Sequence, residues 1–180
     1  MNQQQVYIQF LEALEEHWEE ELTYKRNEYL SVAGDVATEI YWIRSGSLRV
    51  FVCEEEEHTI RFGYQNSIIT ALDSFITGAP SMFYIQALKK TELRVMSKLR
   101  YETLLEESPL IKEAWTALLK SFVVQQMERE LDLITYAPQK RVERLLQRSP
   151  QVFQEIPLKY IASYARMTPE TLSRILKNLD

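Results

Sequence analysis

Residues 156–180 read IPLKYIASYARMTPETLSRILKNLD, and this stretch determines the C-terminal architecture that we expect. Two short helical patterns lie on either side of a tight turn. The second begins at Thr168-Pro169-Glu170. The threonine hydroxyl can accept an amide hydrogen of the first helical turn, and proline suits the first helical position because its missing N–H needs no partner there. Glu170 favours the positive end of the helix dipole. The stretch therefore predicts two helices joined by a turn.

The second helical pattern has two chemically different faces. An apolar stripe at helical spacing is formed by Leu172, Ile175, Leu176 and Leu179. Ser173, Arg174 and Lys177 lie largely off that stripe. Such a helix can pack one side against its domain while it offers the other to a groove of DNA.

The charge of the chain is divided unevenly along its length. The formal net charge is -5, which argues weakly against a nucleic-acid partner. Residues 136–180 hold eight Lys/Arg and four Asp/Glu, a net of +4, whereas the remainder holds 13 basic and 22 acidic residues, a net of -9. Because attraction to phosphates acts locally, a basic C-terminal module can bind DNA while an acidic body precedes it.

Several classes of protein are disfavoured by what the sequence lacks. Cys53 is the only cysteine, which excludes a disulfide within the chain and a cysteine-only zinc or iron–sulfur site. No apolar run approaches the roughly 20 residues that span a membrane, and no signal peptide is recognisable, so a cytoplasmic location is expected. A cupin-type metalloenzyme would need clustered ligands, but the only histidines are His17 and His58. We therefore expect no metal site, no catalytic residues and no enzyme activity.

Residues 21–98 alternate short β-branched or aromatic runs with turn signals, which predicts an antiparallel barrel or sandwich. Ser45-Gly46 is interpreted as a hairpin turn, and the acidic run Glu54–Glu57 as a solvated hairpin tip. The expected strands are Glu39–Arg44, Ser47–Cys53, His58–Tyr64, Phe83–Leu88 and Glu92–Ser97.

A long helix is predicted from Ser108-Pro109, a helix start, to residue 134. The Tyr136-Ala137-Pro138 break then forms a hinge before a basic helix at 139–148. The first half of the long helix leaves little polar face, so that half must be buried on nearly all sides. Two interpretations stay open: an intrachain core helix, or the preferred one, a dimerisation helix. The residues expected to face a second copy are Ile111, Trp115, Leu118, Leu119 and Phe122.

In this order, a β-rich body, a long apolar helix, a hinge and a helix-turn-helix resemble the cAMP receptor protein/Fnr (Crp/Fnr) family of bacterial transcription regulators. The resemblance rests on Gly34-Asp35, residues 41–50, residues 75–78, Ile161-Ala162 and residues 168–176. It implies an α+β fold: an N-terminal double-stranded β-helix of the cyclic-nucleotide-binding type (a β-roll) with flanking helices, a dimerisation helix and an all-α helix-turn-helix domain. The implied domains are residues 1–108, 109–135 and 136–180.

The effector site that the resemblance implies is altered in this chain. Family members that bind cAMP present a Gly-Glu pair and an Arg-Ser pair, which hold the ribose and the cyclic phosphate. The matching positions here are Thr70-Ala71 and Ser81-Met82, without carboxylate or guanidinium. Burying a phosphate without a charged partner costs at least a few kcal/mol, so cAMP binding and any other cofactor are not expected. A candidate pocket for an unknown effector comprises Thr70, Ala71, Phe75, Ser81, Met82 and Phe83.

The resemblance also implies roles in DNA binding. Base contacts are assigned to Pro169, Glu170 and Arg174, because arginine can pair with guanine and glutamate can accept from cytosine. Pro169 replaces a basic residue of some members. Phosphate contacts are assigned to Lys159, Arg166, Thr168, Ser173 and Lys177.

Two features keep a rival interpretation open, namely a dimeric signalling module that has lost DNA binding. Arg166 stands where the family often has glycine, so a positive φ would be strained, and the sequence ends at Asp180, before a winged hairpin. The implied partners are double-stranded DNA with a two-fold symmetric operator, a second copy of this chain, and RNA polymerase as a further candidate.

Overall fold

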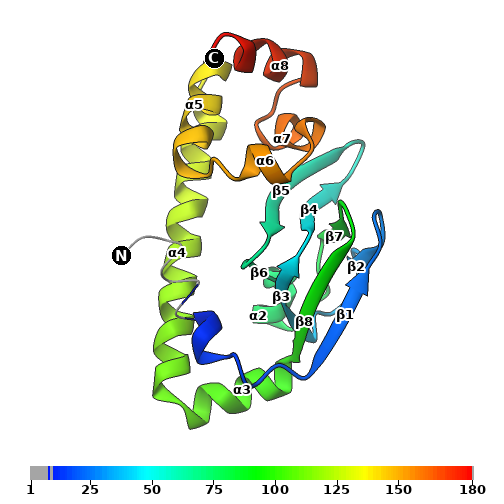
Figure 1. Ribbon diagram of the computed structural model, residues 1–180, viewed down its shortest axis with the longest axis vertical. Helices are drawn as coiled ribbons and strands as arrows, with labels where there is room; N and C mark the ends of the chain where they lie inside the picture. The colour runs from blue at the N-terminus through cyan, green and yellow to red at the C-terminus, as the bar shows by residue number, and fades with distance from the viewer. Residues whose placement is uncertain (1–7, 9, 180) are drawn as a thin grey trace.

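The structure is a computed structural model that describes residue 8 and residues 10–179 (Figure 1). Its β part, the roll, consists of two four-stranded antiparallel sheets, with strand orders β1-β8-β3-β6 and β2-β7-β4-β5. All five expected strands are present to within about one residue. The strands are β1 (Glu20–Tyr24), β2 (Tyr29–Ser31), β3 (Glu39–Ser45), β4 (Ser47–Cys53), β5 (Glu57–Tyr64), β6 (Ile68–Ile69), β7 (Tyr84–Ala87) and β8 (Thr91–Ser97).

β3 shows why this sequence forms a sheet that is covered on both sides. Tyr41 and Ile43 point into the roll and join a core that both sheets share. Ile40 and Trp42, on the opposite face, join a second core with the flanking helices. Successive strand residues point to opposite faces, so a continuous apolar run is what a doubly covered strand requires.

The hairpin predicted at Ser45-Gly46 is wrong. β3 pairs with β6 and β8, whereas β4 pairs with β5 and β7, so this turn carries the chain from one sheet to the other. Gly46 has φ 97°, and a Cβ there would lie 2.4 Å from Thr91 Oγ1. The glycine therefore permits a close crossing between sheets. The acidic tip is a hairpin turn, because β4 and β5 pair on either side of it.

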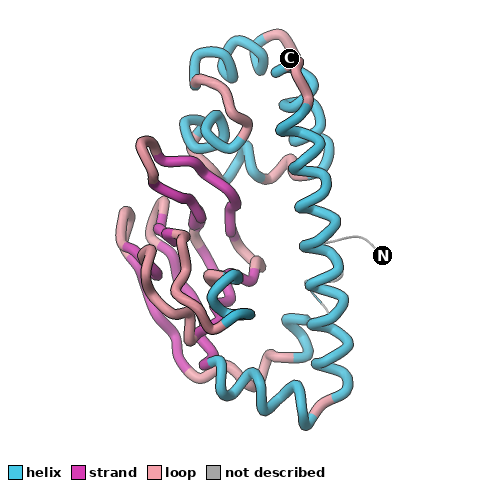
Figure 2. The backbone as a smooth tube through the Cα atoms, turned by 180° about the vertical axis from the view of Figure 1, so that it is seen from behind, coloured by secondary structure: helices cyan, strands magenta, loops and turns pink. Residues whose placement is uncertain are grey.

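The helices frame the roll. A short N-terminal helix that includes residues 10–13 and α3 (Lys98–Glu107) pack against the outer face of one sheet, and α4 (Pro109–Ile134) runs along one side of the molecule (Figures 1 and 2). Ser108 caps α4 by accepting from the Ile111 amide, as the helix-start signal predicted. The remaining helices are α2 (Leu72–Thr77), α5 (Pro138–Arg148), α6 (Val152–Glu155), α7 (Leu158–Tyr164) and α8 (Pro169–Lys177).

The five residues expected to face a second copy are core residues instead, which corrects the assignment of the dimer face. Leu118 is fully buried, Ile111, Trp115 and Phe122 are at most 9% exposed, and Leu119 packs partly buried against the same core. Trp115 lies against the rings of Phe10 and Tyr101, 5.6 and 5.0 Å away between centroids. The roll and the flanking helices therefore cover the face of α4 that carries these side chains.

Helices α5–α8, the helix-turn-helix module, have their own small core, which includes Val142, Leu145, Ile161 and Leu172. Phe62, Tyr64 and Leu88 of the roll pack against that core, so the module is docked on the roll (Figure 1). The predicted segment 1–108 begins in residues outside the described part of the chain, and 136–180 ends one residue beyond it. Among the helices of the described residues, none is long and apolar enough to span a membrane.

Candidate nucleic-acid interface

The turn between α7 and α8 requires a positive φ at Arg166, the conformation that is unfavourable for arginine. Arg166 adopts φ 54°, in the left-handed region. The Arg166 amide donates to the Ser163 carbonyl at 3.2 Å and the Met167 amide donates to the Ala162 carbonyl at 3.0 Å, which together form a Schellman motif. A left-handed conformation costs a non-glycine residue about 1–2 kcal/mol. The two backbone hydrogen bonds and the packing of α7 therefore hold Arg166 in a strained conformation.

α8 begins as the sequence predicted. Thr168 is the N-cap and its hydroxyl accepts from the Thr171 amide at 3.2 Å, with Pro169 in the first turn. Leu172 and Ile175 are buried in the core of the module. The opposite face is open, and one shallow surface hollow there is lined by Leu158, Pro169, Glu170, Ser173, Arg174, Lys177 and Asn178. The structure thus brings together all three predicted base-contact residues and two of the predicted phosphate contacts.

The other predicted phosphate contacts lie outside this hollow. Lys159, Arg166 and Thr168 are exposed, and Lys159 lies over the Tyr160 ring, 4.5 Å from its centroid. The pKa of Glu170 lies below its usual value because the carboxylate accepts from its own backbone N–H and from the Thr168 hydroxyl. None of the salt bridges among the described residues joins Glu170 to Arg174, so the arginine that should read a base is not committed to this neighbour.

The residues that α4 does expose were missed by the sequence reasoning. Met127 is 61% exposed and Leu131 53% exposed, and both lie in the second half of the helix. With their neighbours they follow the spacing of a and d positions in a coiled coil. This outer stripe consists of Val123, Val124, Met127, Leu131 and Ile134. The heptad spacing was present in the sequence and could have identified it.

The six residues of the candidate effector pocket are spread over different environments. Phe75 is buried among the helices, whereas Ala71 is buried inside the roll. Met82 is 66% exposed, and Phe83 packs partly buried against the roll core. Thr70 donates its hydroxyl to the Glu39 carbonyl at 2.8 Å.

Ser81, the last of the six, is bound to an acid of its own chain. Its hydroxyl donates to the Asp73 carboxylate at 2.9 Å, and the Met82 amide donates to the same carboxylate at 3.3 Å. A carboxylate thus occupies the donors at the position where the resemblance places the phosphate-binding pair.

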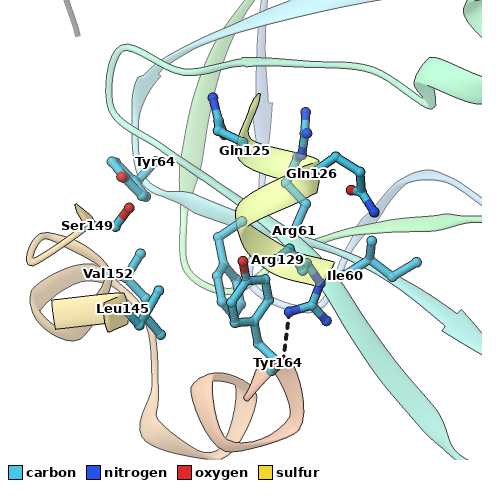
Figure 3. Close-up of a pocket in the computed structure, with 11 residues that line it drawn as sticks. Ile60, Arg61, Tyr64, Gln125, Gln126, Arg129, Leu145, Ser149, Val152 and Tyr164 are labelled. Carbon is cyan, nitrogen blue, oxygen red and sulfur yellow. Dashed lines mark hydrogen bonds between the residues drawn. The ribbon is translucent and has the colours of Figure 1, made fainter. Parts of the chain in front are cut away.

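One arginine of α4 joins the three parts of the molecule. Arg129 is buried, donates to the Tyr164 carbonyl of α7 at 2.8 Å and to the Thr59 carbonyl of β5 at 3.1 Å, and stacks over the Tyr164 ring (Figure 3). Burial lowers the pKa of its guanidinium. Replacing Arg129 would leave two buried carbonyl oxygens unpaired, so it fixes α4 to both the roll and the module.

Direct contacts between the roll and the module reinforce this junction. The Ser163 hydroxyl accepts from the Thr59 amide at 3.1 Å and donates to the Glu57 carbonyl at 3.3 Å. Lys89 forms a 2.6 Å ion pair with Glu155. The roll is therefore connected to α7, the helix that precedes the turn into α8.

Comparison with known proteins agrees with this geometry. The family model of the cyclic nucleotide-binding domain matches residues 21–108. FixK2 from Bradyrhizobium japonicum superposes with a TM-score of 0.76 at 17% identity, over 89% of this chain and 83% of that one. The c-di-GMP responsive global regulator CLP of Xanthomonas campestris gives 0.70 at 18% identity, over 94% and 90%. A transcriptional regulator of the Crp/Fnr family from Eubacterium rectale gives 0.68 at 16%, over 94% and 81%.

No curated protein matches the chain in a direct sequence comparison. Residues 21–108 are a domain of the cyclic nucleotide-binding type, and the chain as a whole has the fold of Crp/Fnr transcriptional regulators. The predicted fold class and the resemblance are therefore confirmed.

Proposed function

We propose that the protein is a non-enzymatic, sequence-specific DNA-binding regulator of transcription that acts in the cytoplasm as a homodimer without responding to cAMP. The observation that carries this proposal is the two-sided character of α8. Its apolar side is buried in the module, while Glu170, Arg174 and Lys177 share one exposed hollow. An uncovered polar and basic helix face on a helix-turn-helix module is suited to the major groove.

The roles within α8 follow from side-chain chemistry. The Arg174 guanidinium can donate two hydrogen bonds to guanine, and the exposed Glu170 carboxylate, which is ionised at neutral pH, can accept from cytosine. Lys177 and Ser173 flank them and can contact phosphates, which position the helix without reading sequence. Arg166, whose side chain is exposed at the turn, adds a cation beside them.

The dimer is supported by the outer stripe of α4. Exposed apolar residues at a and d spacing are costly in water and stabilising against a second copy of the same helix. Parallel pairing through this stripe would place two α8 helices symmetrically. A separation of about 34 Å, one turn of DNA, lets both enter successive major grooves and makes the operator two-fold symmetric.

Independence from cAMP is supported by Asp73. A cyclic phosphate placed beside Ser81 and Met82 would compete with this carboxylate for the same donors and would be repelled by its charge. CLP is described as responsive to c-di-GMP, so regulators of this fold serve different effectors. RNA polymerase remains a candidate partner that no contact in the chain identifies.

A mobility-shift titration with random-sequence duplex DNA at low and high salt tests the DNA-binding proposal. We expect binding at low salt that weakens steeply as salt rises, because phosphate contacts release counterions. An Arg174→Ala/Lys177→Ala double variant should bind much more weakly. No binding by the wild-type protein even at low salt would instead favour the signalling module without DNA binding.

A further inference from the structure

A cavity of about 90 Å³ lies where the roll, α4 and the helix-turn-helix module meet (Figure 3). Its walls come from β5, α4, α5, α6, α7 and the α5–α6 connection. The volume is several times what a single water molecule needs. A ligand in this cavity would touch all three parts of the molecule, in contrast to one inside the roll.

Among residues 8 and 10–179, those that line the cavity include two arginines, Arg61 and Arg129, and no carboxylate. Neither takes part in the salt bridges formed among the described residues. Arg129 is 7% exposed and its hydrogen bonds go to neutral carbonyl oxygens, while Arg61 lies over the Phe122 ring, 4.4 Å from its centroid. Buried charges are normally paired, so the buried Arg129 and the partly buried Arg61, both without a salt-bridge partner among the described residues, favour an anion.

Neutral groups around the arginines complete an anion site. Figure 3 shows Tyr64 and Ser149 on one side of the cavity, and Arg61, Gln125 and Arg129 on the other. The Tyr64 phenol is protonated at neutral pH and can donate a hydrogen bond, and burial, with Glu155 and Tyr164 adding to it, raises its pKa further. These hydroxyl, amide and guanidinium groups line the cavity from different elements, and a tetrahedral oxyanion can accept hydrogen bonds from several sides.

The surroundings of the cavity also hold unused donors. The buried Thr59 Oγ1 and Arg141 Nε have no hydrogen-bond partner in the described part of the chain. Arg141 shares a small neighbouring hollow with Arg129. The acid in that hollow, Asp132, forms ion pairs with Arg148 and Arg144 and no salt bridge with Arg129, although its buried Oδ1 has no hydrogen-bond partner in the described part of the chain. Within the described part of the chain, Arg61 and Arg129 therefore have no salt-bridge partner at this junction.

We propose that this cavity binds a small oxyanion of the phosphate class, either inorganic phosphate or the phosphate group of a phosphomonoester. Arg61 and Arg129 hold it from β5 and α4, and Tyr64 and Ser149 contribute from β5 and the α5–α6 connection. The regulatory part rests on the proposed function: the bound anion fixes the module relative to α4 and thereby changes the affinity of α8 for DNA.

Thermal unfolding and calorimetric titration of the full chain, without DNA, test the site. Inorganic phosphate should raise Tm above the value in chloride at equal ionic strength. Arg61→Gln should weaken phosphate binding about tenfold or more, because a charge-assisted contact is lost. Arg44→Gln is the matched control. Arg44 also stacks on a ring, 4.3 Å from the Trp42 centroid, but lies on β3, so its replacement should leave phosphate binding unchanged.

Phosphate that stabilises no more than chloride, or that binds Arg61→Gln as well as wild type, would overturn the site. AMP and adenosine distinguish the sources of phosphate. Binding of AMP but not adenosine supports a phosphomonoester, and binding of inorganic phosphate alone supports the free ion. Equal binding of AMP and adenosine would contradict recognition of the phosphate group.

The same protein separates this inference from the proposed function. Phosphate binding without any DNA binding would support the phosphate site and contradict the proposed DNA-binding function. DNA binding without phosphate binding would support the DNA-binding function and contradict the phosphate site. Where both bind, DNA should change the phosphate affinity by the same factor by which phosphate changes the DNA affinity. Identical DNA affinity with and without saturating phosphate would overturn the regulatory part.

Discussion

Helix α4 carries two apolar surfaces, one in each half of the helix, and they lie in opposite environments. The inner face, with Trp115 and Leu118, is covered by the roll and the flanking helices, whereas the outer stripe, with Met127 and Leu131, is left exposed. Both faces are apolar, so their chemistry does not distinguish a core from an interface. What distinguishes them is packing, because the rest of the described chain covers only the inner face.

The largest effect is expected on the inner face. Trp115→Ala should lower the free energy of unfolding by about 3–5 kcal/mol, because it removes a buried aromatic side chain that contacts Phe10 and Tyr101. Urea denaturation measures the change. Tyr136, just beyond the helix, is 99% exposed, so Tyr136→Ala should change stability by less than about 0.5 kcal/mol. Equal losses for both variants would show that α4 is not packed as described.

On the outer face we expect loss of association without loss of folding. Met127→Glu places a charge in the proposed dimer interface and should raise the dimer dissociation constant about 30-fold or more, since residues at the centre of an interface contribute about 2 kcal/mol or more. Sedimentation equilibrium measures it. Thr116→Glu adds the same charge at an exposed position of α4 outside the stripe and should leave the dimer intact. A Met127→Glu protein that remains fully dimeric would place the interface elsewhere.

A third face, that of α8, is exposed and polar, and its proposed partner is DNA. Arg174→Ala should cost about 1–3 kcal/mol of specific binding and relax the preference at one base pair. Lys177→Ala should instead weaken binding to all sequences alike and reduce the salt dependence. Fluorescence anisotropy with a selected site and single-base variants distinguishes the two. Unchanged discrimination in Arg174→Ala would remove Arg174 from base recognition.

The smallest effect is a change in stability that we expect at the turn between α7 and α8. Arg166→Gly should raise the stability by about 0.5–1 kcal/mol, because relief of the left-handed strain exceeds the entropic cost of glycine. The hydrogen bond from Arg141 goes to the backbone carbonyl of residue 166 and survives the change. Arg174→Gly, in a regular helix, should be destabilising by about 1 kcal/mol. A destabilised Arg166→Gly protein would mean that the arginine side chain stabilises the turn.

Local signals predicted much of this fold. Thr168-Pro169 and Ser108-Pro109 marked helix starts that the structure shows as N-caps, and five strands were identified from their β-branched and aromatic runs. Strands β2 and β6 escaped prediction because three or two residues give too little periodicity, and β1 escaped because its five residues, EELTY, are mostly polar. The turn at Ser45-Gly46 was misread because a glycine turn is the same locally whether it joins paired strands or separate sheets.

The candidate site was predictable only where a single element carries it. Pro169, Glu170 and Arg174 lie within about one and a half turns of one helix, so spacing alone placed them together. The junction around Arg129 combines residues from β5, α4 and α7 that are up to about a hundred positions apart, and no local pattern connects them. On sequence alone, buried residues of α4 were assigned to the dimer interface. A contrast between an apolar and a polar face normally identifies the buried side of a helix, and the mostly apolar first half of α4 offers little such contrast.

In vitro selection of duplex DNA by the purified wild-type protein tests the central claim most directly. A dimer that pairs through the outer stripe and presents two α8 helices should enrich a two-fold symmetric motif with half-site centres about 10–10.5 base pairs apart. Each half-site should lose its preference at one position in the Arg174→Ala protein. Enrichment of no sequence, or of a single unpaired half-site, would contradict a dimeric regulator of this design.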